Sequence, residues 1–536
     1  MNEAAPLTAD LQATRIGRVV SVSGSQLITL LDQHIGGDDD NPASRKPDIG
    51  EVVNVRTSTT IAFGLVTGLS IPIPEQIEGK AELRIMELEL IGEIEHDGIF
   101  RRGVSTFPGL GDGVFHTSRE DLRRVFMRAG DNGVRIGVVN QDKSIPACVM
   151  VDELLGKHFA VLGTTGTGKS CAVAVILRNI LAAHSKAHIV VLDQHNEFAP
   201  AFGDMAEQIT PADLQLPYWL LNFEEMKQLI IGDASQTPEI DSVILHQVIV
   251  QAKRNLLAVR DTTSTVTVDT PVPYRLSEVT QLLDEAMGKL DRPVDSAPYL
   301  RIREQFLSLQ SDRRFSFMFP GVTVRDNMAA ILSRLFRIPV RDKPVTVIDT
   351  SGIPSEVLNV VVSLLCRMTF DFALWSDQTV PILLVCEEAH RYAPSEDKTI
   401  FEPTKRALSR IAKEGRKYGV SLCLVSQRPS ELASTVLSQC NTIFALRMSN
   451  QKDQEFLRAA MPESGIGLLD ELPSLRNAEA IAVGEGVPIP TRICFDELPS
   501  DGRPRSKTAP FSTAWATEVS SDSFLQNVVS RWRNQR

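Results

Sequence analysis

One eight-residue motif constrains the fold of this chain more than any other feature. Residues 163–170 read Gly-Thr-Thr-Gly-Thr-Gly-Lys-Ser and match the phosphate-loop pattern G-x-x-x-x-G-K-[ST] at every defined position. The apolar run His158 to Leu162 predicts a strand before the motif, and the segment from Ser170 to about Ala183 predicts a helix after it. Because the loop amides and the helix N-terminus must converge on one phosphate, the motif fixes a strand, a turn and a helix in space.

The motif predicts a binding site for a nucleoside triphosphate. Lys169 is expected to reach the β- and γ-phosphates and the Ser170 hydroxyl to bind Mg²⁺, so ATP and Mg²⁺ are the expected cofactors. A chance Gly/Thr turn is the alternative interpretation, and the flanking strand and helix disfavour it. The predicted nucleotide-binding residues are Gly163, Thr164, Thr165, Gly166, Thr167, Gly168, Lys169 and Ser170.

A phosphate loop alone does not separate kinases, GTPases and ATPases. Asp349 to Gly352 fits a GTPase D-x-x-G pattern, but the segment begins 180 residues after Lys169. Asn450 to Asp453 nearly mimics the guanine-reading N-K-x-D pattern, with its residues in the wrong order. Both features argue against a GTPase.

The arrangement of apolar segments predicts an α/β protein. From about residue 155, strand-length runs alternate with helix-length segments, which is typical of βαβ units around a parallel sheet. Short strands within residues 15–70 indicate a small N-terminal barrel. The expected strands of the sheet are 158–162, 189–193, 344–349, 382–387, 420–426, 442–447 and 479–483. The expected parts are a β-barrel domain (1–150), a P-loop NTPase core (151–200 and 340–495), a helical insertion (201–339) and a tail or interface arm (496–536).

Two adjacent acids follow one of the expected buried strands. The apolar run Ile382 to Cys386 leads directly into Glu387 and Glu388. In an NTPase, the first acid at such a strand end holds the Mg²⁺ shell and the second polarises the attacking water, which makes Glu387 a metal-binding and Glu388 a catalytic residue. A solvated acidic strand end is the alternative. Asp193 is a second candidate for the metal ligand, and Asp349 is a weaker one. For both residues, the simpler interpretation is an acid that caps a strand end or a turn.

A polar side chain ends a further strand. The run Val420 to Val425 is followed by Ser426-Gln427-Arg428-Pro429, and a polar residue at a strand end beside the phosphate strand can contact the γ-phosphate. Gln427 is therefore a catalytic candidate, against an ordinary loop amide. His195 and His390 are interpreted as structural by default.

A basic helix lies in the second half of the chain. Residues 401–420 hold six Lys/Arg against Glu402 and Glu414, in a helix that ends at Tyr418-Gly419. Three interpretations stay open: a solvated face, a surface for nucleic-acid phosphates, or arginines delivered to the ATP of a neighbouring subunit. Arg410 and Arg416 are the candidates for the last role. Arg406, Arg410, Lys413 and Lys417 recur at the spacing of one helical stripe.

Composition constrains the partners and the cellular compartment that can be expected for the protein. The net charge is −11, so a nucleic acid must be held by a local basic patch against the global field. Seven scattered cysteines indicate a reduced, cytoplasmic protein without a zinc site. The N-terminal residues predict no signal peptide, and the apolar runs are shorter than the roughly 18 residues of a membrane helix, so no membrane is expected.

At this point the chain resembles a HerA-type ATPase of the HerA/FtsK branch, over residues from about Arg15 to Cys494. Several motifs in the order of the family are more specific than a phosphate loop alone. They are Leu155 to Gly163, Leu192-Asp193-Gln194-His195-Asn196-Glu197-Phe198, Val345 to Gly352, Glu387 to Pro394, and Gly415 to Thr442 with its Ser426-Gln427-Arg428-Pro429 segment.

The resemblance implies a RecA-like ATPase core, an N-terminal barrel, a helical insertion and a homo-hexameric ring that moves on double-stranded DNA with a nuclease or other effector. It supports Lys169 and Ser170 at the nucleotide and metal, Glu387 and Glu388 as the acid pair, and Gln427 as a phosphate sensor. It favours Arg416 over Arg410 as the residue acting in trans. Lys157 stands where family members can carry a second basic residue, although a lysine lacks the planar fork of arginine.

Two functional hypotheses follow from the motifs and the resemblance. The first is an ATP-hydrolysing, hexameric double-stranded DNA translocase or helicase that works with an effector. The alternative is an ATPase ring that acts mainly as scaffold and regulator of an anti-phage defence effector, such as a nuclease or a sirtuin-like NAD-consuming enzyme. DNA-stimulated ATP hydrolysis with strand displacement separates the two.

Overall fold

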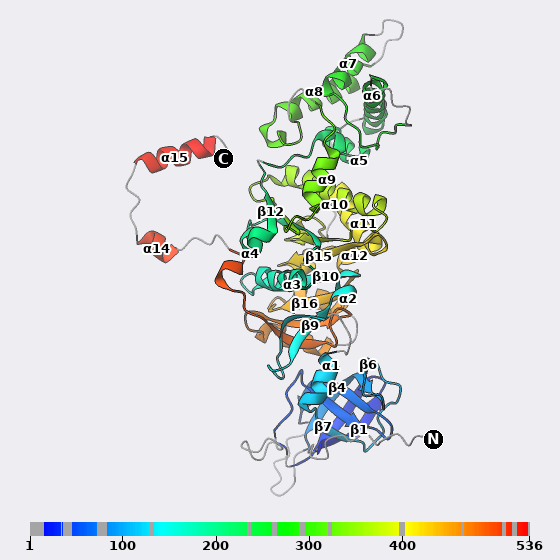
Figure 1. The fold of residues 1–536 in the computed structure, drawn as a ribbon, viewed down its shortest axis with the longest axis vertical. Coiled ribbons are helices and arrows are strands. Elements are labelled where there is room, and N and C mark those ends of the chain that lie inside the picture. Colours follow the sequence, from blue (N-terminus) through cyan, green and yellow to red (C-terminus); the bar gives the residue numbers. More distant parts are fainter. Residues whose placement is uncertain are drawn as a thin grey trace.

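Figure 1 shows the computed structural model of the chain, an elongated molecule with a barrel at one end, a large sheet in the middle and helices at the other end. The structure describes residues 15–33, 35, 45–71, 83–127, 133–211, 213–232, 235, 237–259, 265–288, 295–319, 324–395, 402–461, 466–505, 511–516 and 522–533.

The N-terminal strands close into a small barrel. Strand β2 pairs with both β1 and β5, which joins the two ends of the order β2-β1-β7-β3-β4-β5, and β6 extends the sheet from β5. Alternating inward residues such as Val53 and Val55 fill the interior, as the two-residue period of a strand requires. The strands are β1 (Arg15–Ser23), β2 (Gln26–Leu31), β3 (Val52–Arg56), β4 (Ile61–Ser70), β5 (Ile85–Ile94), β6 (Phe100–Arg102) and β7 (Gly113–His116).

An eleven-stranded sheet forms the middle of the molecule, in the order β12-β13-β11-β14-β15-β10-β16-β17-β18-β8-β9. The pairs from β12 to β16 are parallel, and the strands from β16 onward pair antiparallel. The strands are β8 (Gly133–Val139), β9 (Pro146–Met150), β10 (His158–Leu162), β11 (His188–Asp193), β12 (Ala206–Ile209), β13 (Val345–Asp349), β14 (Ile382–Cys386), β15 (Val420–Ser426), β16 (Cys440–Leu446), β17 (Glu479–Gly484) and β18 (Thr491–Phe495).

Helices cover the faces of this sheet and build the insertion. Strands β10, β13, β14 and β15 are buried along their whole length, as expected for parallel strands covered on both faces. The helices are α1 (Arg119–Phe126), α2 (Val151–Leu155), α3 (Lys169–Ala183), α4 (Ala199–Phe202), α5 (Phe223–Ile230), α6 (Pro238–Val259), α7 (Leu276–Met287), α8 (Ala297–Ser311), α9 (Met328–Phe336), α10 (Ser355–Trp375), α11 (Glu402–Tyr418), α12 (Ser434–Leu437), α13 (Gln451–Ala460), α14 (Phe511–Trp515) and α15 (Asp522–Arg533). The expected fold class, a P-loop α/β core with an N-terminal barrel and a helical insertion, is confirmed.

The end of the barrel domain differs from the expected boundary at residue 150. Strands β8 and β9 lie before that residue, yet β8 pairs with β18 and both strands belong to the central sheet. The side chain of Arg102 on β6 also donates to the backbone carbonyls of Pro488 and Gly484, 2.7 Å away, which ties the barrel to the core. The change from barrel to core therefore lies between α1 and β8, earlier in the chain than expected.

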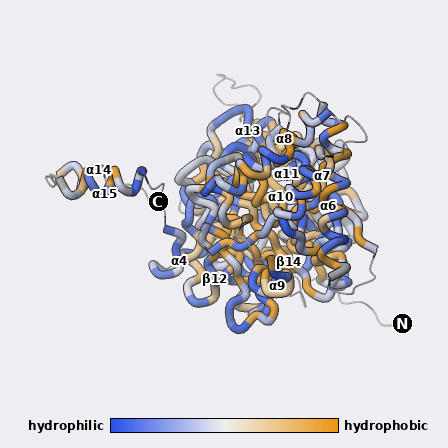
Figure 2. Tube along the Cα trace, turned by 90° about the horizontal axis from the view of Figure 1, so that it is seen from above, coloured by the Kyte–Doolittle hydropathy of each residue, from blue (hydrophilic) through white to orange (hydrophobic). Residues whose placement is uncertain are grey.

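Helix α10 is the core helix of the parallel sheet. Its segment Val357–Trp375 has the length and apolar composition of a membrane span, but 72% of the relevant window is buried inside the protein. Packing against the sheet and α11 accounts for that composition. The tail helices α14 and α15 lie apart from the body in the views of Figures 1 and 2, and their described side chains are exposed.

A buried histidine joins the phosphate strand to its neighbours. The His158 side chain, 3% exposed, accepts the Leu422 amide on Nδ1 at 3.0 Å and donates from Nε2 to the Ile411 and Ala412 carbonyls at 3.1 and 3.0 Å. This pattern requires the neutral ring, and burial lowers the pKa of His158.

We expect His158→Leu to destabilise the fold by about 2–3 kcal/mol, because it leaves the Leu422 amide without its acceptor in the core. The stability that the histidine provides is present above the ordinary imidazole pKa of about 6.5 and is lost as pH falls through the lower folded-state value. Urea unfolding of both chains at pH 8 and pH 5 measures this. Equal stabilities at pH 8, or a gap that widens in acid, contradict the assignment.

Candidate nucleotide-binding site

The phosphate loop follows β10, which lies between β15 and β16 near the centre of the sheet. Gly166 and Gly168 have φ angles of 77° and 100°, in the left-handed region that favours glycine. Gly168 is also the N-cap of α3, so the loop passes directly into the helix. The strand, turn and helix predicted around the motif are all present.

The loop is arranged to receive an anion. Among the described residues, the structure records no acceptor for the backbone N–H groups of Thr165, Gly166, Thr167 and Gly168. Lys169, 7% exposed, donates to the Thr164 carbonyl at 3.0 Å and so closes the loop over its own ammonium group. These unpaired donors at a helix N-terminus fit the oxygens of a phosphate.

Burial and nearby acids act in opposite directions on Lys169. Burial lowers its pKa, whereas the negative charges of Glu388, Glu387 and Glu197 raise it. Burial has the larger effect, so the pKa of Lys169 is lowered overall, and the three acids limit the decrease. A triphosphate adds further negative charge beside the same lysine.

Glu387 is the deepest acid of the site. It is 3% exposed and accepts the Gln194 amide at 2.9 Å. Burial, with the charge of Asp193 beside it, raises its pKa to about 9. Two acids this close favour a shared proton unless a cation lies near, so the donor set of Glu387 and Asp193 fits a hard divalent ion such as Mg²⁺.

The two rival acids have different positions. Asp193 accepts the amides of Glu197 and Phe198 at 3.1 and 2.9 Å, and it lies beside Glu387. Asp349 pairs with Asp193 across β11 and β13, but its carboxylate accepts the amide of Ser351 at 2.8 Å and caps its own turn. Asp193 thus belongs to the site, while Asp349 serves the turn after β13.

Glu197 is a site residue that the sequence reasoning missed. The Ser170 hydroxyl, the expected Mg²⁺ ligand, donates to Glu197 Oε2 at 3.1 Å. Glu197 is four residues beyond the end of β11, where the turn starting at Asp193 returns the chain towards α3. An acid shortly after a parallel strand that neighbours the acid-bearing strand was the available signal.

Glu388 lies in a strained turn and is held by three side chains. Its φ angle of +51° is in the left-handed region, which is uncommon for a non-glycine residue and costs of order 1 kcal/mol or more. Oε1 accepts from Gln427 Nε2 and lies 3.4 Å from His195 Nε2, and Oε2 lies 3.3 Å from His390 Nδ1. The two histidines interpreted as structural therefore contact the predicted catalytic acid.

Gln427 connects this acid to the phosphate loop. Strand β15 lies directly beside β10, and the Gln427 amide oxygen accepts the hydroxyl of Thr165 while its amide nitrogen donates to Glu388. Gln427 thus links the loop to Glu388. The position is that expected for a contact to the γ-phosphate.

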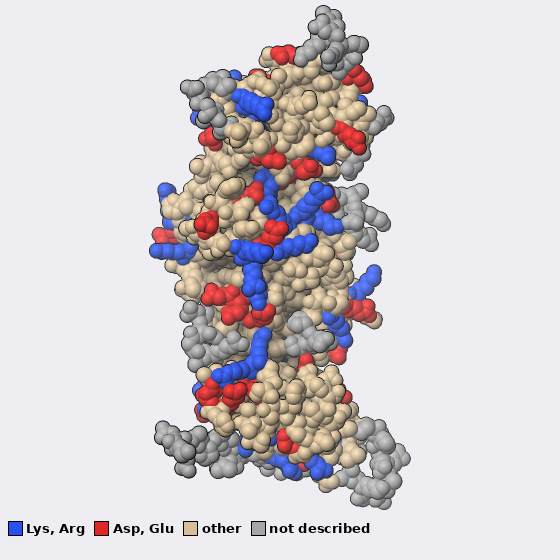
Figure 3. Space-filling model, turned by 90° about the vertical axis from the view of Figure 1, so that its right-hand side faces the viewer, with Lys and Arg blue, Asp and Glu red and all other residues tan. Residues whose placement is uncertain are grey.

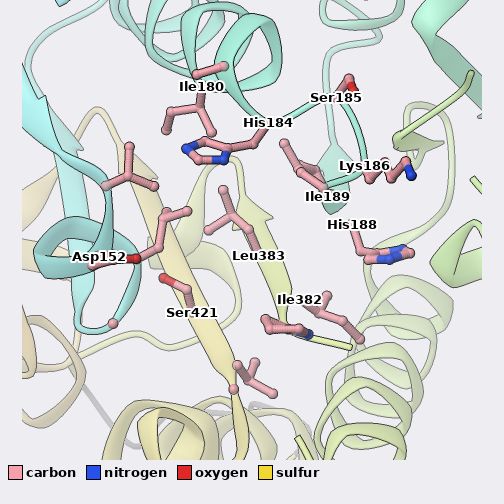
Figure 4. Close-up of a pocket in the computed structure, with 18 of the residues that line it drawn as sticks. Asp152, Ile180, His184, Ser185, Lys186, His188, Ile189, Ile382, Leu383 and Ser421 are labelled. Atoms are coloured by element: carbon pink, nitrogen blue, oxygen red, sulfur yellow. The ribbon is translucent and has the colours of Figure 1, made fainter. Parts of the chain in front are cut away.

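The basic residues predicted to act in trans lie away from the loop. Arg416 lines an apolar cavity of about 680 Å³ at the opposite edge of the sheet, where β11, β14 and β15 begin, together with His184, His188 and Ser421 (Figure 4). The Arg416 side chain is exposed, and no hydrogen bond or ion pair to another described residue is recorded for it. It cannot reach the phosphate loop of its own chain.

Lys157 and Arg410 have partners within the chain. Lys157 precedes β10, at the end of the strand opposite the loop, and forms an ion pair with Glu485. The Arg410 guanidinium lies 3.6 Å from Asp371 and packs over the Phe370 ring, and Arg406 pairs with Glu402 at 3.2 Å. Two cations of the predicted helical stripe are thus engaged locally, which weakens its interpretation as a continuous phosphate-binding surface.

A parallel sheet with a phosphate loop on one strand, an acid pair two strands away and a polar strand between them defines a P-loop ATPase. Residues 134–369 match the sequence family described as the central domain of the helicase HerA. The central part of the chain is thus similar to the HerA helicases, and the ATPase class expected from the motifs is confirmed.

Curated relatives extend this match over most of the chain. The DNA double-strand break repair helicase HerA of Pyrococcus furiosus is 26% identical over 483 residues, covering 83% of this chain and 84% of that protein. A probable helicase of Methanocaldococcus jannaschii is 25% identical over 491 residues, covering 86% and 88%. The solved structure of VirB4 of Thermoanaerobacter pseudethanolicus is similar with a TM-score of 0.48 and 16% identity, over 70% of this chain and 99% of that one.

We expect Glu387→Gln to stabilise the nucleotide-free protein at pH 8 in Mg²⁺-free buffer. The folded state holds the Glu387 proton up to about pH 9, against an ordinary value of 4.5, so folding stability falls as pH rises between these values. The amide removes this loss, and the thermal midpoint should rise by about 2–5 °C at pH 8 and show no gain near pH 4.5. Asp349→Asn is the matched control and should show no such pH-dependent gain. A lower midpoint for Glu387→Gln at pH 8 contradicts the assignment.

Proposed function

We propose that this chain is an ATP-hydrolysing motor that translocates on double-stranded DNA as a homo-hexameric ring. The observation that supports this proposal most directly is that the nucleotide-binding groups and Arg416 lie at opposite ends of the strands of one sheet. The phosphate loop and the acids lie at the carboxyl ends of the strands, and the exposed Arg416 lies at the opposite edge. In a closed head-to-tail ring, the side of one subunit that carries Arg416 faces the side of the next subunit that carries the phosphate loop.

The chain's own residues supply binding and orientation for hydrolysis. Bound Mg²⁺-ATP supplies the phosphoryl group to be transferred and the positive charge that offsets its oxygens. Lys169 and the loop amides hold the phosphates, and Ser170 and Glu387 are the residues that would hold the ion, with Asp193 and Glu197 in contact with them. Glu388 orients the attacking water and accepts its proton.

Gln427 and Arg416 complete the arrangement. Gln427 already touches both the loop and Glu388, so it senses whether the terminal phosphate is present. Arg416, delivered by a neighbour, neutralises charge that develops on the transferred group, a contribution that reaches about 10³-fold or more in related phosphoryl transfers. Lys157, paired with Glu485, is proposed as a secondary interface residue.

Double-stranded DNA is the proposed track. The relatives named above are helicases by name, and one is a double-strand break repair helicase. Figure 3 shows lysine and arginine side chains gathered in the middle of one face, at the height of α11, although the chain as a whole carries a net charge of −11. Contacts of this kind go to phosphates and carry little sequence information.

A nuclease or another effector, such as a sirtuin-like enzyme, is the proposed partner, and this part rests on the resemblance to the family alone. The scaffold hypothesis differs in one measurable property: it does not need DNA to stimulate the ATPase. DNA-dependent turnover with strand displacement supports the motor, whereas turnover that ignores DNA favours the scaffold.

Lys169→Ala should reduce ATP hydrolysis by at least about 10³-fold, and Glu388→Gln should keep nucleotide binding while reducing turnover by about 10²–10³-fold. Binding is measured with a fluorescent ATP analogue and turnover by phosphate release. Gln427→Ala is the matched comparison and should lose less than Glu388→Gln. Normal turnover by Glu388→Gln contradicts the assignment of the acid pair.

Mixing Arg416→Ala subunits with Lys169→Ala subunits should restore part of the activity that each lacks alone. The reason is that a Lys169→Ala subunit still offers its arginine to a neighbour whose loop is intact. Native mass spectrometry shows whether mixed rings form. Mixed rings without recovered activity contradict the role of Arg416 in trans.

A further inference from the structure

The two arginines of α11 that the sequence singled out lie in different surroundings. Arg416 is exposed, and no partner among the described residues is recorded for it, whereas the Arg410 guanidinium carbon lies 4.1 Å from the centre of the Phe370 ring. Six residues on a helix correspond to a rotation of about 240° beyond one full turn, so the two side chains leave α11 on different sides. Arg410 faces α10, and Arg416 faces outward.

Phe370 of α10 holds α11 at two points. The ring is 1% exposed, carries Arg410 over one face and meets the ring of Tyr418 edge-on, with 5.2 Å between ring centres. Arg410 and Tyr418 lie on either side of Arg416 in the sequence. The last two turns of α11, which present Arg416, are therefore fixed against one buried aromatic side chain.

A chain of ion pairs continues from Arg410 to the helical insertion. Asp371 lies 3.6 Å from Arg410 through one oxygen and accepts Arg367 Nη1 at 3.1 Å through the other. Arg367 Nε in turn donates to both carboxylate oxygens of Glu225, at 3.2 and 3.1 Å. Glu225 belongs to α5, the first helix of the insertion.

The inner part of this chain has little freedom to rearrange. Glu225 is 1% exposed, also accepts the Ser363 hydroxyl at 2.8 Å, and closes a capping box with Asn222 at the start of α5. The charges of Glu225 and Asp371 raise the pKa of Arg367 against its burial. Because a buried charge cannot lose its partner without a large cost, α5 and α10 hold Arg367 at a fixed position.

We propose that Arg410 is a positioning residue that aims Arg416, and that the chain Glu225–Arg367–Asp371–Arg410 couples the helical insertion to this arginine. The proposal rests on the proposed function, in which Arg416 completes the ATP site of a neighbour. It replaces the expectation that Arg410 itself enters that site. A displacement of the insertion by a bound partner or by DNA then changes the hydrolysis rate in the next subunit.

Arg410→Ala should lower kcat about tenfold and leave the KM for ATP within about twofold, because the phosphate loop of each subunit is untouched and only the transition-state interaction is lost. Glu402→Gln is the matched control on the same helix, because it removes the exposed ion pair with Arg406 and leaves the contacts of Arg410 in place, and it should keep both parameters. Arg410→Lys keeps the charge near Asp371 without the planar stacking, and it should recover part of kcat. Unchanged kcat in Arg410→Ala overturns the proposal.

Mixing variant subunits distinguishes a loss of Arg416 positioning from a general loss of activity in the Arg410→Ala subunit. Mixing Arg410→Ala with Lys169→Ala subunits should restore activity, because Lys169→Ala subunits present a correctly held Arg416 to intact loops. If Arg416→Ala is rescued in this way and Arg410→Ala is not, with mixed rings shown to form, the positioning role is wrong. If activity is not restored with Arg416→Ala either, the result contradicts the proposed action of Arg416 in trans, on which the positioning role depends. Should Arg410→Ala not fold, the same test on Arg410→Lys gives the answer.

A double-mutant cycle tests the link to the insertion. Glu225→Gln should lower kcat about threefold with unchanged KM, and the Glu225→Gln/Arg410→Ala pair should be no slower than Arg410→Ala alone, because the chain is already broken. Glu224→Gln, at the exposed neighbouring position, is the control and should have no effect. Multiplicative losses in the double mutant overturn the coupling.

Discussion

The structure depends on holding several carboxylates around one buried lysine. Glu197, Glu387 and Glu388 all act on Lys169, and Asp193 acts on Glu387. Burial favours the neutral form of each group, so the pKa of Glu387 rises and that of Lys169 falls. A phosphate beside the lysine and a cation beside the acids relieve both effects. Fully buried parallel strands keep these groups in place.

The sequence allowed the prediction of the groups that belong to local motifs. The loop from Gly163 to Ser170 and the acids Glu387 and Glu388 follow from short patterns joined to a strand, because adjacent residues at a strand end must share its position. The contacts of His195 and His390 with Glu388 could not be found in this way. They depend on how three separate turns meet at one edge of the sheet, and a histidine in a turn has many structural uses.

The same limit explains the two places where the structure departs from the expected organisation. An alternating strand pattern shows that β8 has two unlike faces, but it does not show which sheet the strand joins, and β8 pairs with β18 from the far end of the chain. Likewise, the spacing of Arg406 and Arg410 predicts a common stripe on α11. Their partners Glu402 and Asp371 come from different helices. Periodicity alone therefore does not predict whether these arginines are already paired within the chain or can bind a phosphate.

The arrangement of one sheet gives each subunit two separate roles. Its carboxyl edge cleaves a nucleotide, and its opposite edge presents Arg416, which has no function towards its own loop. If Arg416 acts on the site of a neighbour, as proposed above, a small rotation or tilt of one subunit changes hydrolysis in that neighbour. Since α10 packs on the sheet and carries both Phe370 and Arg367, movement of the insertion and movement of the sheet reach α11 through the same helix. In the proposed ring, sequential hydrolysis is favoured over independent hydrolysis, because each site then depends on the orientation of the neighbouring subunit.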